Sequence, residues 1–175
     1  MRLGIDFGTT RIVVAAVDRG NYPLVSFEGP GGTWYDWFPP LVAIRGPMRV
    51  YGWAAWQAQE ERGWTVVRSI KRYLEQAGPY TRVQLGDQQV SMVQLLQELL
   101  SELRRALIED SSLNLEPDER LQAVVGVPAN ANSNQRFLTV EGFRLAGFDV
   151  LGLVNEPSAA SIEFVHAQQL SLIHI

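Results

Sequence analysis

Residues 1–17, MRLGIDFGTTRIVVAAV, constrain the fold of this chain more than any other stretch. Residues 2–7 alternate apolar and polar side chains, and residues 12–17 are apolar and β-branched, so each segment is predicted to be a strand. The short connection predicts that they pair as an antiparallel hairpin. Ordinary two-residue hairpins turn through Asn-Gly or Asp-Gly. Here Asp6 ends the first strand and Gly8, Thr9 and Thr10 form the turn.

This turn carries the groups that bind phosphate and a hydrated metal ion. Backbone N–H groups around a glycine can approach phosphate oxygens closely. A carboxylate such as that of Asp6 can hold Mg²⁺ through its waters, because magnesium gives up its hydration shell reluctantly. The alternative is an ordinary turn in which Asp6 and the threonines cap nearby backbone groups.

The remainder of the chain is predicted to alternate strands and helices. The expected strands and helices are, in order, a third strand at 22–27, a hairpin of 41–44 with 48–51, helices at 52–62 and 66–76, a β pair of 81–85 with 88–90, a helix from Ser91, a strand at 121–127, a helix at 133–146, a strand at 149–154 and a helix from Pro157. Three antiparallel strands followed by crossover units predict an α/β fold, a mixed sheet with helices on its faces.

The helix that begins at Ser91 has the clearest pattern in the chain. Ser91 and Gln94 have the spacing of a capping box. The stripe that is expected to face the core consists of Met92, Leu96, Leu99, Leu103 and Leu107. In the tryptophan-rich region 30–64, Trp53 and Trp56 are expected on one helix face, packing in the core, with an exposed partner patch as the alternative.

Composition excludes several classes of protein. With 175 residues, 46% of them hydrophobic, the chain can form one domain with a core. Its net charge of -4 predicts no affinity for nucleic acid or an anionic membrane. The absence of cysteine excludes disulfides and thiolate metal sites. No apolar run is long enough to span a bilayer, and Asp6 and Arg11 interrupt any signal peptide. We therefore expect a soluble, cytoplasmic protein.

Two further segments carry candidate functional residues. Lys71 lies in SIKRY, within a predicted helix, where a lysine is usually exposed and inert. The second segment begins with VGVPA, which contains Pro128, and continues through NSNQR, which contains Arg136, to NEPSAA. Glu156 stands just before Pro157 in this last run, where it could simply favour the start of a helix.

Taken in this order and spacing, the motifs resemble those of the DnaK-type, seventy-kilodalton heat-shock chaperone family, within the superfold of actin, sugar kinases and chaperone ATPases. The resemblance runs from Leu3 to about Phe164, and the series VPA, NxxQR, AG and NEPSAA is its most specific part. It implies an actin-like (ribonuclease H-like) ATPase lobe with a mixed five-stranded sheet. Residues 1–170 would be lobe I of the nucleotide-binding domain, with the second lobe and the peptide-binding domain absent, and residues 171–175 do not match.

The resemblance also implies a role for individual residues. Asp6 would hold Mg²⁺ through water, while Gly8, Thr9 and Thr10 would cradle the β- and γ-phosphates of ATP or ADP. Lys71, Glu156 and Thr9 would act at the γ-phosphate and the attacking water. Pro128 and Arg136 would relay the nucleotide state to the peptide-binding domain. Two departures stand out: Arg11 replaces a small polar residue, and Asn130-Ala131 replaces an aromatic pair.

The implied function is ATP hydrolysis coupled to the binding of unfolded polypeptide clients, with co-chaperones as further partners. This activity belongs to the full-length protein, and the present chain alone is expected to be inactive. One alternative is a sugar or small-molecule kinase of the same superfold, which needs a catalytic aspartate over a substrate hydroxyl. No such aspartate is evident, and Lys71 with NEPSAA argues against it. The other alternative is an actin-like filament protein.

Overall fold

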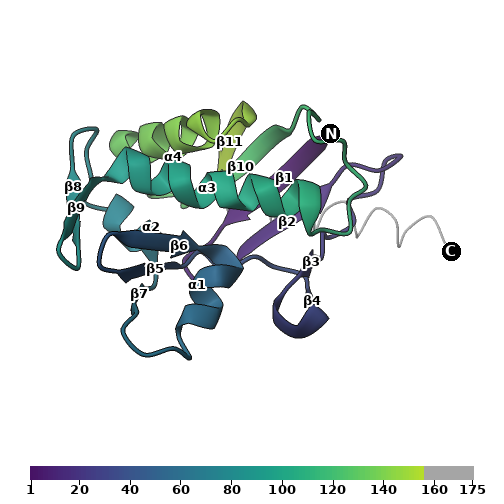
Figure 1. Ribbon diagram of the computed structural model, residues 1–175. Helices are drawn as coiled ribbons and strands as arrows, with labels where there is room; N and C mark the ends of the chain where they lie inside the picture. Colours follow the sequence, from purple (N-terminus) through teal and green to yellow (C-terminus); the bar gives the residue numbers. More distant parts are fainter. Residues whose placement is uncertain (156–175) are drawn as a thin grey trace, which may run out of the picture.

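A computed structural model describes residues 1–155 as a mixed α/β fold (Figure 1). Its main sheet has four strands in the order β11-β10-β1-β2. Strand β1 (Arg2–Phe7) runs antiparallel to β2 (Ile12–Ala16) and parallel to β10 (Gln122–Val127), which in turn is parallel to β11 (Asp149–Asn155). The predicted opening hairpin is therefore confirmed, within one residue of its expected ends.

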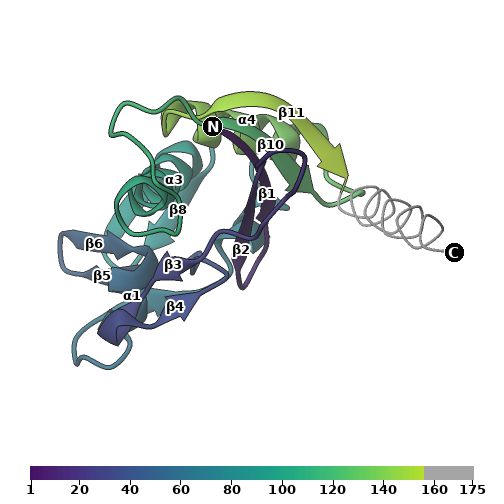
Figure 2. The same cartoon turned by 90° about the vertical axis from the view of Figure 1, so that its right-hand side faces the viewer.

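One face of this sheet forms the core with two helices, α3 (Met92–Glu109) and α4 (Ser133–Leu145) (Figure 2). Alternation along β1 buries Leu3, Ile5 and Phe7 on that face. The ring of Phe7 meets that of Phe143 of α4 edge to face, with 6.0 Å between centroids. The period-two pattern of the first strand thus fixes which face carries the helices.

The expected third strand at residues 22–27 does not form, and the five-stranded sheet is not confirmed in the described part of the chain. Residues 23–25 lie beside β2, where Ala16 N donates to Pro23 O and Val25 N donates to Val14 O. Pro23 has no N–H to give in return, which limits the pairing to an isolated bridge. Only Phe27–Glu28 (β3) is a strand here, and it pairs with Trp34–Tyr35 (β4).

A smaller β unit lies below the main sheet in Figure 1. It consists of β5 (Val42–Arg45), β6 (Met48–Tyr51) and β7 (Thr65–Val67), with helix α1 (Gly52–Ala58) packed on β5 and β6. The hairpin of β5 and β6 and the pair β8 (Arg82–Leu85) with β9 (Gln88–Ser91) confirm the predictions. A short 3₁₀ turn, η1, covers Pro30–Gly32.

The two helices predicted at 52–62 and 66–76 are partly wrong. The first ends at Ala58, and the second is reduced to α2 (Ile70–Leu74). Val66 and Val67 belong to β7 instead, opposite Ala43 and Val42 of β5. Their β-branched side chains favour a strand as soon as an edge is available for pairing.

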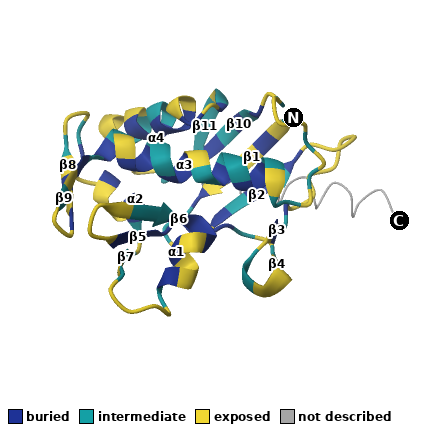
Figure 3. Cartoon of the chain, viewed as in Figure 1, coloured by how far each residue is buried: buried dark blue, intermediate teal, exposed yellow. Residues whose placement is uncertain are grey.

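Helix α3 is buried along the predicted leucine stripe, and Figure 3 shows buried positions recurring along it. Ser91 Oγ accepts from Gln94 N at 3.2 Å, but the Gln94 side chain donates to Glu98, so only half of the capping box forms. Gly142 of α4 faces this helix, since a Cβ there would lie 2.9 Å from Leu96 Cβ. In the described part of the chain, no helix is long and apolar enough to cross a membrane.

Glu98 joins α3 to the small β unit through a half-buried polar cluster. Arg49 Nη2 donates to Glu98 Oε1 at 2.8 Å and Arg49 Nε to Glu98 Oε2 at 3.0 Å, while the Tyr51 hydroxyl also donates to Oε2. Burial opposes ionisation of Glu98, but the hydrogen bonds from Arg49, Tyr51 and Gln94 outweigh it and lower its pKa. Burial, reinforced by Glu98, raises the pKa of Tyr51.

We expect Leu99→Ala to lower the free energy of unfolding by about 2–5 kcal/mol, because Leu99 is fully buried beneath the sheet and truncation leaves a cavity. Denaturant titration measures this. Ser101→Ala, at an exposed position of the same helix, should change stability by less than about 0.5 kcal/mol. Equal effects of the two substitutions would show that the leucine stripe does not carry the packing.

The Glu98 cluster should make stability depend on pH. Because the folded pKa of Glu98 is lowered, its contribution is complete above its unfolded pKa and is lost as pH falls through the folded value. Glu98→Gln should therefore lower the melting temperature near neutral pH, and the difference from the unsubstituted chain should shrink towards about pH 3. Glu60→Gln, at an exposed position, is the control. A difference that stays constant with pH would contradict the argument.

Candidate functional site

A cleft of about 240 Å³ opens where β1 and β10 end. Its lining comes from segments far apart in the sequence and consists of Asp6, Gly8, Thr9, Lys71, Glu75, Pro128 and Gln135. Because β1 and β10 are parallel, with Asp6 opposite Gly126, their carboxyl ends meet at one edge of the sheet. Open α/β sheets bind ligands at this edge.

The turn after β1 supplies one wall of the cleft. Gly8 has no room for a side chain, because a Cβ there would collide with the Arg11 carbonyl oxygen. The turn therefore closes tightly on itself, and only glycine fits at this position. Asp6 is exposed at the end of the strand and Thr9 is half-buried, both against the cleft, whereas Thr10 is exposed and does not line it.

Lys71 enters the cleft from α2, a helix of five residues. Its side chain is only 9% exposed, and Nζ lies 5.9 Å from the centroid of the Phe7 ring. The alternative of an ordinary solvent-exposed lysine therefore does not hold. The residue before the helix, Ser69, has φ 63°, a left-handed conformation that is costly for a residue with a side chain.

The start of α4 forms the opposite wall. Asn132 N donates to Gln135 Oε1 and Gln135 N donates to Asn132 Oδ1, both at 2.9 Å, which completes a capping box. Asn132 Nδ2 also donates to the Glu75 carbonyl oxygen at 3.4 Å, so the cap reaches the end of α2. The same residues that begin α4 thus help to hold the helix that carries Lys71.

Sequence reasoning missed Glu75 as a residue of the cleft and named Gln135 only as part of a motif. Glu75 follows Lys71 by four positions, the spacing that puts two side chains on one face of a helix, so the signal was present.

Among the predicted relay residues, Pro128 lines the cleft but Arg136 does not. Arg136 Nε donates to Ala131 O and its Nη2 to Asn155 Oδ1, at 3.1 and 2.9 Å. Glu156 and the helix predicted from Pro157 lie outside the described residues.

The donors in the cleft suit a hydrated cation that binds mainly to the phosphate groups of a substrate and only secondarily to the protein. Within residues 1–155 no group of three or more His, Asp or Glu side chains could hold a metal ion alone. Asp6 offers a carboxylate beside the glycine turn, and Lys71 supplies a cation to the same cleft. Mg²⁺ commonly binds through one or two carboxylates together with substrate phosphates, which fits this donor set.

A larger and more open depression of about 920 Å³ lies beside α2 and β8. Its lining includes Arg68, Arg72 and Arg82 but none of Asp6, Gly8, Thr9 and Lys71. The cleft that contains Asp6 and Lys71 is smaller, yet it alone of the two combines a glycine turn, a carboxylate and a buried lysine. The smaller cleft is therefore the candidate functional site.

Comparison with known proteins adds independent findings. Residues 49–169 match the family model described as Hsp70 protein. The chain is 30% identical over 162 residues to the chaperone protein DnaK of Halobacterium salinarum, and 33% identical over 183 residues to a chaperone protein HscA homolog of Chromobacterium violaceum. It is 31% identical over 181 residues to the stromal 70 kDa heat shock-related protein, chloroplastic, of Pisum sativum.

These matches cover 93% of this chain for the DnaK and the stromal protein and 94% for the HscA homolog. They cover 24%, 25% and 28% of the respective relatives, so the chain spans about a quarter of the length of the proteins it matches.

Asn132→Ala should destabilise the protein by about 1 kcal/mol, since it removes the cap of α4 and the hydrogen bond to the end of α2. Amide hydrogen exchange within residues 70–74 should become faster as well. Asn130→Ala, in the exposed turn two residues earlier, is the matched control. If exchange in α2 is the same in both variants, the cap does not hold α2 in place.

Proposed function

The chain belongs to the Hsp70 family, and from this premise we propose that it is lobe I of the actin-like ATPase domain of a DnaK-type chaperone. The observation that carries the proposal is the convergence of Asp6, the Gly8-Thr9 turn and Lys71 on one cleft. The lobe would extend over residues 1–170, with residues 171–175 as a non-matching tail. The segment at residues 23–25, bridged to β2, would take the place of the fifth strand of the sheet.

We assign roles to the turn, to Lys71 and to Glu156. The tight turn at Gly8 would present backbone N–H groups to the β- and γ-phosphates of ATP or ADP, with the hydroxyls of Thr9 and Thr10 beside them. Lys71, buried and directed into the cleft, would stabilise the charge that develops on the γ-phosphate and orient the attacking water. Glu156 would help to position the same water.

Asp6 would hold Mg²⁺ through water, and the bound ion would neutralise charge on the phosphates. The other contacts with the phosphates would come from side chains and backbone groups of the protein. Lys71 approaches from α2 and the turn from β1, so the phosphates would be bound from two sides. Since phosphoryl transfer depends mainly on positioning and on stabilising charge, this arrangement suits ATP hydrolysis.

In the whole protein, ATP hydrolysis would regulate the binding of unfolded polypeptides, assisted by co-chaperones, in the cytoplasm. Pro128 in the cleft and Arg136 of α4, which donates to Asn155 at the end of β11, would couple the nucleotide to that second activity. A sugar kinase or an actin-like filament is not favoured, because the family model is that of Hsp70 and the relatives named above include the chaperone proteins DnaK and HscA.

Titration of Mg-ATP into the ¹⁵N-labelled 175-residue chain tests the proposal. We expect weak binding, with a dissociation constant of roughly 1 mM or above because water screens the contacts of an open cleft, and no phosphate release. Amide shifts should concentrate at Asp6, Gly8, Thr9 and Lys71. Lys71→Met should weaken binding of Mg-ATP more than of Mg-ADP, whereas Arg72→Met, exposed on the same helix, should not. Shifts confined to another surface, or none, would refute the proposal.

A further inference from the structure

Arg11 follows the phosphate turn directly and lies in a defined place. Its guanidinium carbon is 5.1 Å from the centroid of the Trp37 ring, within the range of a cation–π contact. The side chain is otherwise exposed. The residue is also one of the two departures from the motif pattern of the family, so the family's phosphate turn does not explain it.

Strand register puts Arg11 on the same face of the sheet as Asp6. Asp6 is directly opposite Val13 in the β1–β2 hairpin, and residues opposite each other share a face. Arg11 precedes Val13 by two positions, so alternation carries it to that face as well. Ile12, between them, is fully buried on the other face, where the helices pack.

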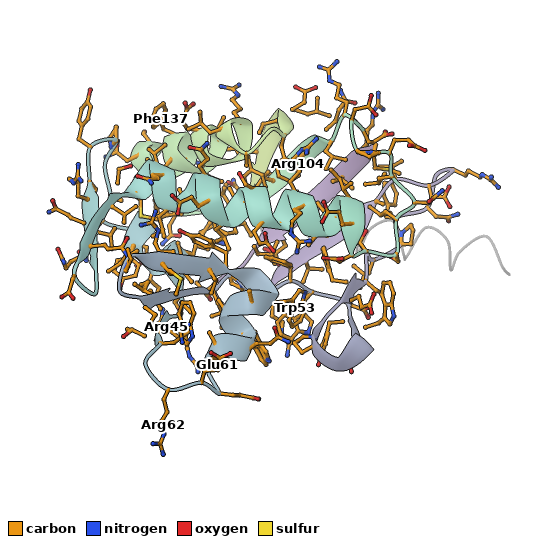
Figure 4. The ribbon with its side chains drawn as sticks, viewed as in Figure 1. Arg45, Trp53, Glu61, Arg62, Arg104 and Phe137 are labelled. Atoms are coloured by element: carbon orange, nitrogen blue, oxygen red, sulfur yellow. The ribbon has the colours of Figure 1, made fainter. Side chains whose placement is uncertain are left out.

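Trp37 is held close to the start of β2 by its neighbour in the chain. Its neighbour Phe38 forms two backbone hydrogen bonds with Ile12, each of 2.8 Å, and is buried with it. Trp37, partly buried, packs against the same core and lies beside Arg11. The ring centroids of Tyr35, Trp53 and Trp56 lie 5.5, 5.1 and 5.4 Å from that of Trp37, so three rings hold it in position. Figure 4 shows Trp53 between α1 and β4.

We propose that Arg11 is a second phosphate-binding cation of this site, and that Trp37 positions it. The inference deepens the proposed function and rests on it. The described lining of the cleft holds the carboxylates of Asp6 and Glu75 against the single ammonium of Lys71. A triphosphate adds more negative charge than one Mg²⁺ removes, so a further cation beside the turn is favourable. A guanidinium fits this task, since its planar fork can bond two phosphate oxygens at once.

The test compares binding of Mg-ATP and of magnesium tripolyphosphate to the 175-residue chain, by the same NMR titration. Arg11→Gln should raise the dissociation constant for both ligands by about tenfold, because a charged hydrogen bond to the shared phosphates is lost. Arg45→Gln is the matched control: Arg45 lies 4.4 Å from the centroid of the Trp64 ring, in the small β unit. It removes an arginine–tryptophan contact of the same kind and should leave both constants unchanged.

The role of Trp37 is tested in a double-mutant cycle. Trp37→Leu should weaken binding of both ligands, yet add little in the Arg11→Gln background, because it acts through Arg11. Trp64→Leu is its control. An equal loss from Trp37→Leu in both backgrounds would show a purely structural effect and overturn the positioning role.

The outcomes separate this inference from the proposed function. If the unsubstituted chain binds Mg-ATP at the cleft and Arg11→Gln binds it equally well, the inference fails and the proposed function stands. A loss for Mg-ATP without one for tripolyphosphate would mean that Arg11 meets the nucleoside, which also overturns it. If the unsubstituted chain binds neither ligand, the proposed function fails and the inference with it.

Discussion

The parallel pairing of β1 with β10 is the constraint on which the rest of the structure depends. It joins Arg2 to Gln122 and Asp6 to Gly126 across most of the described chain, so everything between these strands must fit within one crossover. Helix α3 makes the return possible, because its buried stripe covers the face of the sheet that alternation leaves apolar. The same pairing puts the turn after β1 beside Pro128, which follows β10. The strand pairing that builds the core therefore also places the residues of the cleft at one edge of the sheet.

Among the helices described, the stability of α2 depends most on contacts with other parts of the protein. A helix of five residues is far too short to be stable alone. It is held by the buried side chains of Ile70 and Leu74 and by the hydrogen bond from Asn132 to the Glu75 carbonyl. The left-handed Ser69 turns the chain sharply out of β7 into this helix. The position of Lys71 thus rests on tertiary contacts, among them the one from the cap of α4, whose Gln135 also lines the cleft.

Sequence patterns predicted the elements whose own side chains decide their structure. Strands β1 and β10 and helices α3 and α4 have strong periodicity or caps, and each formed within one residue or so of its expected ends. The predictions were wrong for segments whose secondary structure depends on the strand they lie beside. Val66 and Val67 became a strand because β5 offered an edge, and residues 22–27 failed as a strand because Pro23 interrupts the ladder beside β2. The cleft itself was predictable only in part: Lys71 was chosen from family resemblance, since no periodicity distinguishes a buried lysine from an exposed one.

The aromatic cluster shows how a departure from a family pattern can be compensated. Core packing was the expectation for Trp53 and Trp56, and it holds for Trp53, whereas Trp56 is 39% exposed. Together with Tyr35 and Trp37 they tie β4 and α1 to the start of β2. Arg11 would otherwise be a long, mobile charge next to the phosphate turn, and ordering it would cost side-chain entropy each time a ligand binds. By stacking on Trp37 it loses much of that freedom when the protein folds, so the exposed guanidinium is already ordered before a ligand binds.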